Sequence, residues 1–158
     1  VSHFLNQKYN NNQDGMDLAL ITYDPTTQLL QFAGAKSSII YSQNGAVKKC
    51  KGCLFSIGHE NYSVPVTFSQ TTIELEETTR IYMYSDGFQD QFGGGKNKRL
   101  GSKQFAQLLR ETQHLSLSEQ GDLLENFFHN WLDLGSDVQM DDVLVFGAEL
   151  KPQKKTDL

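Results

Sequence analysis

The stretch IELEETTRIYMYSDGFQDQFGG, residues 73–94, decides the interpretation of the fold. Its continuous run of β-favouring residues from 79 to 86 predicts a strand that ends on Asp86. Because Gly87 follows at once, we expect a sharp turn that leaves the Asp86 carboxylate at the edge of a sheet. An Asp-Gly pair is also a common ordinary turn, so spacing alone leaves both interpretations open.

The residues before this stretch predict mostly antiparallel sheet. Residues 17–24 form one β-rich run, residues 28–50 predict two or three short strands, and residues 64–75 predict another. The pair Asn44-Gly45 is typical of a tight hairpin turn. Residues 1–13 resemble the end of a helix followed by a polar loop, and with Val1 in place of Met they favour a piece of a longer protein.

The residues after 100 change to a helical period. Residues 102–113 and 116–135 each carry apolar side chains three and four positions apart, which predicts two amphipathic helices. Ser116 with Glu119 matches a capping box at the start of the second helix. Residues 141–150 predict a final strand. Strands, helices and a closing strand together predict an α+β fold.

Composition limits the classes of function. The chain has 158 residues, 38% of them hydrophobic, which suits one domain with a real core. Its 14 basic and 19 acidic side chains give a net charge of −5, which disfavours nucleic-acid binding. It has neither an apolar run of membrane-spanning length nor a signal-peptide pattern, so we expect a soluble, cytoplasmic protein.

Several chemical candidates have a simpler structural interpretation beside the functional one. Cys50 and Cys53 form a single C-x-x-C, and we favour two unpaired thiols over zinc binding or redox chemistry because a structural zinc site needs more ligands. The basic run at 96–99, next to the glycines at 93–95, is either a mobile surface loop or a contact for substrate phosphate or a partner. The four histidines are interpreted as surface or helix-face residues; they are His3, His59, His114 and His129.

The acidic turns predict a metal site. Asp86 ends one predicted strand, and Asp141 with Asp142 opens another. If these strands are antiparallel neighbours, Asp86 and Asp141 meet at one end of the sheet. Two carboxylates that close repel each other unless a cation lies between them, and oxygen-rich sites favour Mg²⁺ or Mn²⁺.

Several motifs, in order, resemble the SpoIIE-like bacterial phosphatases of the metal-dependent protein phosphatase 2C superfamily. Residues 73–94 resemble the family's strand that ends in Ser/Thr-Asp-Gly, and MDDVLVFGAEL at 140–150 resembles its closing strand. Residues 15–35 are similar to its central strand pair. LFSIG at 54–58 is similar to its Pro-Ile-Gly turn, with Ser56 where Pro is usual. The resemblance covers nearly all of residues 5–150.

The resemblance implies an antiparallel β-sheet sandwich flanked by helices, incomplete at its N-terminus. Residues 1–150 would be the C-terminal part of the catalytic domain and residues 151–158 a charged tail. In this comparison Asp86 and Asp141 match metal ligands, and Asp90 matches an acidic position that supports the metal and water network. Asp142 is expected to be structural. The implied cofactor is a pair of Mn²⁺ or Mg²⁺ ions in the complete domain.

The implied reaction is dephosphorylation of phosphoserine or phosphothreonine by attack of a metal-bound hydroxide. A flexible flap beside the site would touch the substrate through Gly93, Gly94, Lys96 and Arg99. The family's first metal-binding Asp-Gly motif has no counterpart here, because Asp14-Gly15 precedes a strand instead of ending one. We therefore expect this chain alone to be a poor catalyst.

The resemblance also implies partners and leaves a second class of function open. The substrate would be a phosphorylated signalling regulator, such as an anti-sigma-factor antagonist, and a sensor domain would precede this segment in the parent chain. A truncated sandwich would expose apolar surface, so self-association is expected. The first alternative is a non-catalytic module that keeps the phosphatase shape to bind a partner; a plain α+β ligand-binding domain is a further alternative.

Overall fold

The computed structural model describes residues 15–58 and 66–152. The chain divides into two compact units. The first comprises residues 1–39, 50–76 and 152–158, and the second comprises residues 40–49 and 77–151. His3, Asp14, His59 and the expected helical opening of the chain lie outside the described residues.

The first unit contains a three-stranded antiparallel sheet in the order β1-β2-β5. Its strands are β1 (Leu18–Asp24), β2 (Leu29–Ala35) and β5 (Gln70–Glu74). Every second residue of β1 is exposed, as the period of a strand with one covered face requires. Leu30 and Phe32 on β2 are buried. The predicted antiparallel character of this half is confirmed.

Strand β5 is shorter than the predicted run over residues 64–75. It begins at Gln70, opposite Ala33, and residues 66–69 form no strand, while residues 64 and 65 lie outside the described part. The next positions of β2 have a different neighbour, since the Cys53 amide donates to the Gly34 carbonyl at 2.7 Å. The prediction of a strand over residues 66–69 is therefore wrong. Local β propensity does not show which segment pairs with the edge of a neighbouring strand.

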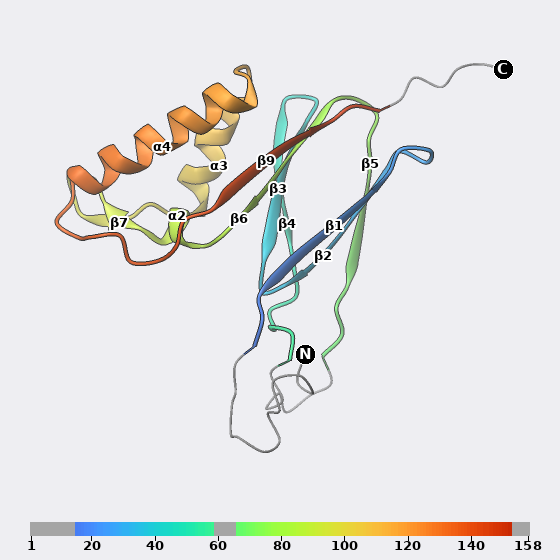
Figure 1. Cartoon of the computed structure of the whole chain (residues 1–158), viewed down its shortest axis with the longest axis horizontal. Coiled ribbons are helices and arrows are strands. Elements are labelled where there is room, and N and C mark those ends of the chain that lie inside the picture. Colours follow the sequence, from blue (N-terminus) through green and yellow to red (C-terminus); the bar gives the residue numbers. More distant parts are fainter. Residues whose placement is uncertain (1–14, 59–65, 153–158) are drawn as a thin grey trace. The chain divides into compact units, whose positions relative to one another are not determined.

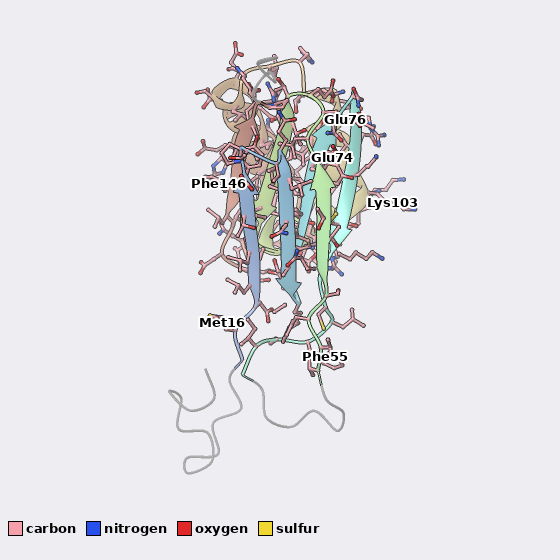
Figure 2. All side chains as sticks on the ribbon, turned by 90° about the vertical axis from the view of Figure 1, so that its right-hand side faces the viewer. Met16, Phe55, Glu74, Glu76, Lys103 and Phe146 are labelled. Atoms are coloured by element: carbon pink, nitrogen blue, oxygen red, sulfur yellow. The ribbon has the colours of Figure 1, made fainter. Side chains whose placement is uncertain are left out.

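The second unit is built on a four-stranded sheet in the order β4-β3-β6-β9 (Figure 1). Its strands are β3 (Ser38–Gln43), β4 (Ala46–Lys51), β6 (Thr79–Tyr84) and β9 (Val145–Leu150). Asn44 and Gly45, with φ of 51° and 71°, turn β3 into β4 as the Asn-Gly signal predicted. β9 is the last strand in this order, and it carries Phe146 (Figure 2). Phe146 is 52% exposed.

Helices complete the second unit. They are α2 (Gly87–Asp90), α3 (Ser102–Glu111) and α4 (Leu117–Asp133), and a small hairpin of β7 (Phe92–Gly93) and β8 (Lys98–Arg99) lies between α2 and α3 in sequence. The capping box is confirmed, with the Glu119 amide donating to the Ser116 hydroxyl at 3.2 Å. The buried core contains Ile40, Tyr82, Phe88, Leu100, Phe105, Leu109, Leu124 and Phe128. Among the described residues, no helix is both long and apolar enough to span a membrane.

Candidate functional site

Strands β6 and β9 bring the predicted acidic residues to one end of a sheet. The two strands pair antiparallel, as the metal hypothesis required, and Tyr84 lies opposite Val145 in the last pair at this end. Asp86 follows β6 closely, and Asp141 precedes β9 on the segment that leads into it. Both side chains are exposed. The sheet therefore places these two carboxylates on chain segments that leave it at the same end.

Strand β9 begins later than predicted, at Val145 and not at Asp141. The Ser85 hydroxyl explains the difference, because it donates to the Asp142 carbonyl and accepts from the Leu144 amide, both at 2.8 Å. The Ser85 amide also donates to the Leu144 carbonyl at 3.0 Å. The Ser85 side chain thus makes hydrogen bonds in place of those that a longer strand would make. Residues 141–144 are therefore held by hydrogen bonds without forming a strand.

Gly87 does not make the sharp turn that the sequence predicted. It is not among the positive-φ glycines, and it begins helix α2 with Asp86 at the N-cap position. The reason for glycine is close approach: a Cβ on Gly87 would lie 2.4 Å from the Asp142 carbonyl oxygen and 3.2 Å from that of Asp141. The Asp86 side chain makes no capping hydrogen bond, so the helix does not use its carboxylate.

Asp90 stands in the same short helix and faces a cation. Arg99 on β8 forms an ion pair with it, and the Arg99 Nε donates to the Asp90 Oδ1 at 3.0 Å. The hydrogen bond and the charge of Asp90 raise the pKa of the Arg99 guanidinium, and the charge of Asp86 raises it further. Arg99 is thus a permanent positive charge beside two of the predicted site residues.

The glycines of the predicted flap have packing roles. A Cβ on Gly93 would lie 2.2 Å from the Trp131 carbonyl oxygen, and one on Gly94 would lie 2.7 Å from the Trp131 ring. Gly94 has φ of 68°, and its amide donates to the Trp131 carbonyl at 2.7 Å. Lys96 is exposed at the hairpin turn. The contact with α4 therefore explains glycine at 93 and 94 but not at 95, where a Cβ would meet nothing within 4 Å. The substrate role of Lys96 and Arg99 stays a prediction.

The side chains at this end of the sheet have the chemistry that a divalent cation requires, but they supply only some of the ligands that a complete site needs. Asp86, Asp90, Asp141 and Asp142 supply carboxylate oxygens, the ligands that Mg²⁺ and Mn²⁺ prefer. Within residues 15–58 and 66–152, however, no three His, Cys, Asp or Glu side chains gather closely enough to hold a metal ion. The metal role of these carboxylates and the lack of a first Asp-Gly motif therefore stay predictions.

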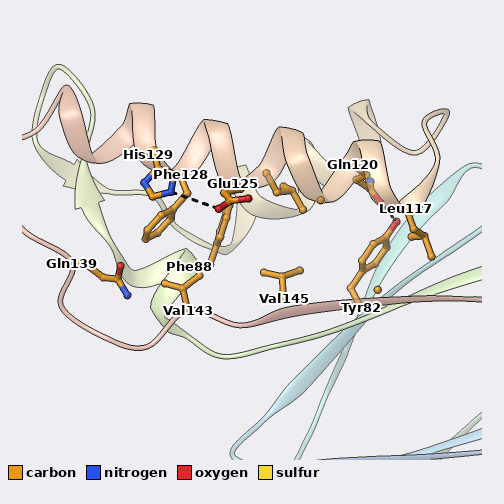
Figure 3. Close-up of a pocket in the computed structure, with 13 residues that line it drawn as sticks. Tyr82, Phe88, Leu117, Gln120, Glu125, Phe128, His129, Gln139, Val143 and Val145 are labelled. Carbon is orange, nitrogen blue, oxygen red and sulfur yellow. Dashed lines mark hydrogen bonds and ion pairs between the residues drawn. The ribbon is translucent and has the colours of Figure 1, made fainter.

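One cavity of the second unit is separate from these carboxylates. It lies between α4 and β9, where Tyr82 and Val145 are among the residues that line it (Figure 3). Its volume is about 390 Å³, and both polar and apolar side chains line it. The Tyr82 hydroxyl donates to the Gln120 Oε1 at 2.9 Å within it. None of the predicted site residues lines this cavity. Its geometry therefore does not support the metal-site prediction.

The cysteines and histidines give no second site in the described part of the chain. Cys50 and Cys53 are not joined in a disulfide. His129 on α4 lies 3.9 Å from Glu125 at an exposed position, and His114 lies outside any cluster of metal-ligating side chains. Sequence reasoning missed two polar residues that matter here, Ser85 and the buried Gln91. For Ser85 the signal was a polar residue at the end of an apolar run, and for Gln91 the sequence around it gave no signal.

Comparison with known proteins identifies the family and the fold. Residues 1–151 match the family described as Stage II sporulation protein E (SpoIIE). The SiaA-PP2C domain of Pseudomonas aeruginosa is 26% identical, with a TM-score of 0.81 over 95% of this chain and 58% of that one. No curated protein matches the chain.

Two further solved structures share the fold at lower identity. The phosphatase domain of SpoIIE from Bacillus subtilis is 14% identical, with a TM-score of 0.61 over 99% of this chain and 67% of that one. The serine/threonine phosphatase PstP of Mycobacterium tuberculosis is also 14% identical, with a TM-score of 0.61 over 95% and 66%. The catalytic domain of PstP has also been solved in complex with two manganese ions.

These matches define an α+β fold of the protein phosphatase 2C type. The chain belongs to the SpoIIE family. It spans 58% of the SiaA domain and about two thirds of the other two, so it corresponds to part of such a domain.

Proposed function

We propose that this chain is the C-terminal part of a metal-dependent protein phosphatase that acts on phosphoserine or phosphothreonine. The observation that carries the proposal is the close packing of Gly87 against Asp141 and Asp142. A Cβ built on Gly87 would lie 2.4 Å from the Asp142 carbonyl oxygen. This contact joins the segment with Asp86 to the segment with Asp141. Membership of the SpoIIE family supports a phosphatase over other uses of two carboxylates.

In this proposal Asp86 and Asp141 hold Mn²⁺ or Mg²⁺, and further ligands come from residues outside this chain. When bound, such ions lower the pKa of a coordinated water and neutralise charge that develops on the phosphoryl oxygens. Asp90 holds Arg99 beside the site through their ion pair. Arg99 and the exposed Lys96 attract the phosphate group of the substrate, since a guanidinium can bind phosphate with two hydrogen bonds.

The proposed substrate is a phosphorylated regulatory protein, such as an anti-sigma-factor antagonist. Its support is the family alone: a relative, SpoIIE of Bacillus subtilis, is described as a cell fate determinant. A sensor domain upstream in the parent chain would control the activity. A phosphoproteome comparison of cells with and without the gene tests this, and we expect a bacterial regulator to accumulate as its phosphoserine form.

The test of the activity is Mn²⁺-dependent hydrolysis of a phosphoserine peptide by the full chain that the gene encodes. We expect turnover that requires metal and is lost in Asp86→Asn and Asp141→Asn. The control is Asp122→Asn, which changes an exposed carboxylate on α4 in the same way and should leave turnover intact. Equal turnover in wild type and Asp86→Asn would refute the proposal.

A second candidate is a non-catalytic module that binds a partner through the phosphatase shape. It is favoured by the absence of a three-residue metal cluster within the described residues. The two candidates separate in the same experiment. A folded full chain without metal-dependent turnover, which still binds a phosphorylated or unphosphorylated regulator, supports the module.

Self-association of this 158-residue chain is proposed as well. β9 is the last strand of its sheet. Phe146 on β9 is 52% exposed, and Leu144, just before the strand, is 63% exposed. Apolar side chains along a strand edge favour pairing with a second copy. Sedimentation over a wide concentration range tests this. A monomer at all concentrations would contradict it.

A further inference from the structure

Gln91 is a buried polar residue that the proposed chemistry does not use. It follows helix α2 directly and is 1% exposed. Its Nε2 donates to the carbonyls of Phe92 and Val138, both at 3.0 Å, and its Oε1 accepts from the Met140 amide at 3.2 Å. Each polar atom of this side chain therefore has a protein partner, and two of the three bonds go to the segment that leads to Asp141.

The backbone of Gln91 is also held by hydrogen bonds. Its carbonyl accepts from the Leu100 amide at 3.0 Å and from the Trp131 Nε1 at 3.3 Å. Gln91 is thus a junction between α2, the hairpin and the end of α4. Because the backbone of Gln91 is held in place, its side chain can hold a neighbouring loop in a defined position.

Apolar packing does not place the segment at Val138 and Met140. The side chains of these two residues are 80% and 63% exposed. Their backbone is held by hydrogen bonds to the Gln91 side chain, and the Asn97 side chain binds Ser136 and Asp137 just before them. At the far end, the Ser85 hydroxyl binds Asp142 and Leu144. The Asp141 carboxylate lies between these two polar attachments.

We propose that Gln91 is a positioning residue, which sets the place of the Asp141 segment relative to the Asp86 turn. The proposal deepens the proposed function and rests on it for the metal. In the metal-loaded protein, Gln91 would act through Asp141 and would not touch metal or substrate. Removal of such an outer support typically weakens metal affinity by about 10-fold to 100-fold.

The chain offers a matched control in Gln120. It is also 1% exposed, its Nε2 donates to the Leu109 carbonyl and the Thr112 hydroxyl, and its Oε1 accepts from Tyr82. Gln91→Met and Gln120→Met therefore each remove two donated hydrogen bonds and one accepted hydrogen bond at nearly constant volume. The first change lies beside the Asp141 segment and the second beside α3 and β6. Any general effect of a lost buried amide should be equal in the two variants.

Two measurements on the full chain that the gene encodes test the proposal. The first is hydrogen–deuterium exchange without metal. We expect exchange of residues 138–144 to rise about tenfold or more in Gln91→Met and to stay at the wild-type rate in Gln120→Met. The second is Mn²⁺ titration followed by the electron paramagnetic resonance of the free ion, where Gln91→Met should bind at least about tenfold more weakly than Gln120→Met.

The outcomes separate this inference from the proposed function. Wild-type exchange at 138–144 in Gln91→Met would overturn the positioning role, and so would equal Mn²⁺ affinity in the two variants. If the wild type binds no Mn²⁺, the proposed function fails, and the exchange comparison alone decides whether Gln91 holds the segment. A variant that unfolds is replaced by Gln91→Glu, which keeps the acceptor for Met140 and should still release Val138.

Discussion

Gly87 and the Asp142 carbonyl oxygen lie so close that a Cβ on Gly87 would be 2.4 Å from that oxygen. Alanine at position 87 must therefore push the two segments apart. We expect Gly87→Ala to lower the free energy of unfolding by about 1–3 kcal/mol, as overpacking does, and to weaken Mn²⁺ binding. Denaturant unfolding and Mn²⁺ titration measure the two effects.

Gly121 provides the control for this substitution. It lies inside helix α4, and a Cβ there would meet nothing within 4 Å. Gly121→Ala should raise the free energy of unfolding by about 0.5–1 kcal/mol, since alanine is the better helix former. Destabilisation by both variants would show that the contact with Asp142 is not what requires glycine at position 87.

Trp131 is the single tryptophan of the chain, so its fluorescence reports on the hairpin that packs against it. Gly94 has φ of 68° and would place a Cβ 2.7 Å from the ring. Gly94→Ala should cost about 1–2 kcal/mol from the backbone alone and shift the emission to the red as the ring is displaced. Gly95→Ala, with nothing within 4 Å of its Cβ, should leave the emission unchanged. Unchanged emission in both variants would contradict the contact.

The burial of two tyrosines predicts that the free energy of unfolding falls at alkaline pH. Burial raises the pKa of Tyr84 to about 12, and burial also raises the pKa of Tyr82. Because the unfolded tyrosine loses its proton near pH 10, the unfolded state binds fewer protons than the folded state above that pH. The stabilisation is present below about pH 10 and is lost as the pH rises toward 12. Unfolding measured from pH 8 to pH 12 should show this decline.

Phenylalanine substitutions separate the two tyrosines. The Tyr84 hydroxyl is buried without a hydrogen-bond partner among the described residues, so Tyr84→Phe should preserve stability at pH 7 and reduce the alkaline decline. Tyr82→Phe loses the bond to Gln120 and should cost about 1 kcal/mol at pH 7. A loss of equal size in the two variants would show that Tyr84 has a partner in solution.

Arg99 and Lys96 are expected to act on the substrate phosphate. Arg99→Ala and Lys96→Ala should each raise KM for a phosphoserine protein several-fold, with a larger effect for Arg99 because of its place beside Asp90. The effect should shrink at high salt. Lys103→Ala, an exposed lysine on α3, serves as the control. Turnover and KM at wild-type values in the first two variants would exclude a role for the hairpin in substrate binding.

The regular elements could be predicted because their signals are local. The apolar spacing of α3 and α4, the capping box at Ser116 and the hairpin at Asn44 depend on neighbouring residues only, and all agree with the structure. The antiparallel pairing of β6 and β9 was only a condition of the metal hypothesis, and the structure meets this condition.

The predictions that failed depend on contacts between distant parts of the sequence. Ser85 ends the ladder before Asp142, and Cys53 takes the edge of β2 beyond Ala33, so the strands start later than their β propensity indicates. The role of Gln91 depends on Val138, 47 positions away. Polar residues of this kind show their function only when the fold brings their partners to them.

The two polar attachments of the Asp141 segment also fix its length. Gln91 holds it at Met140 and Ser85 holds it at Asp142, which leaves Asp141 as the one residue between the anchored amide and the anchored carbonyl. An inserted or deleted residue here would leave one anchor empty or displace the carboxylate. By contrast, the hairpin turn at Gly95 has open space around it. Relatives and engineered variants should therefore tolerate changes in chain length at Gly95, while the spacing from Met140 to Asp142 stays constant.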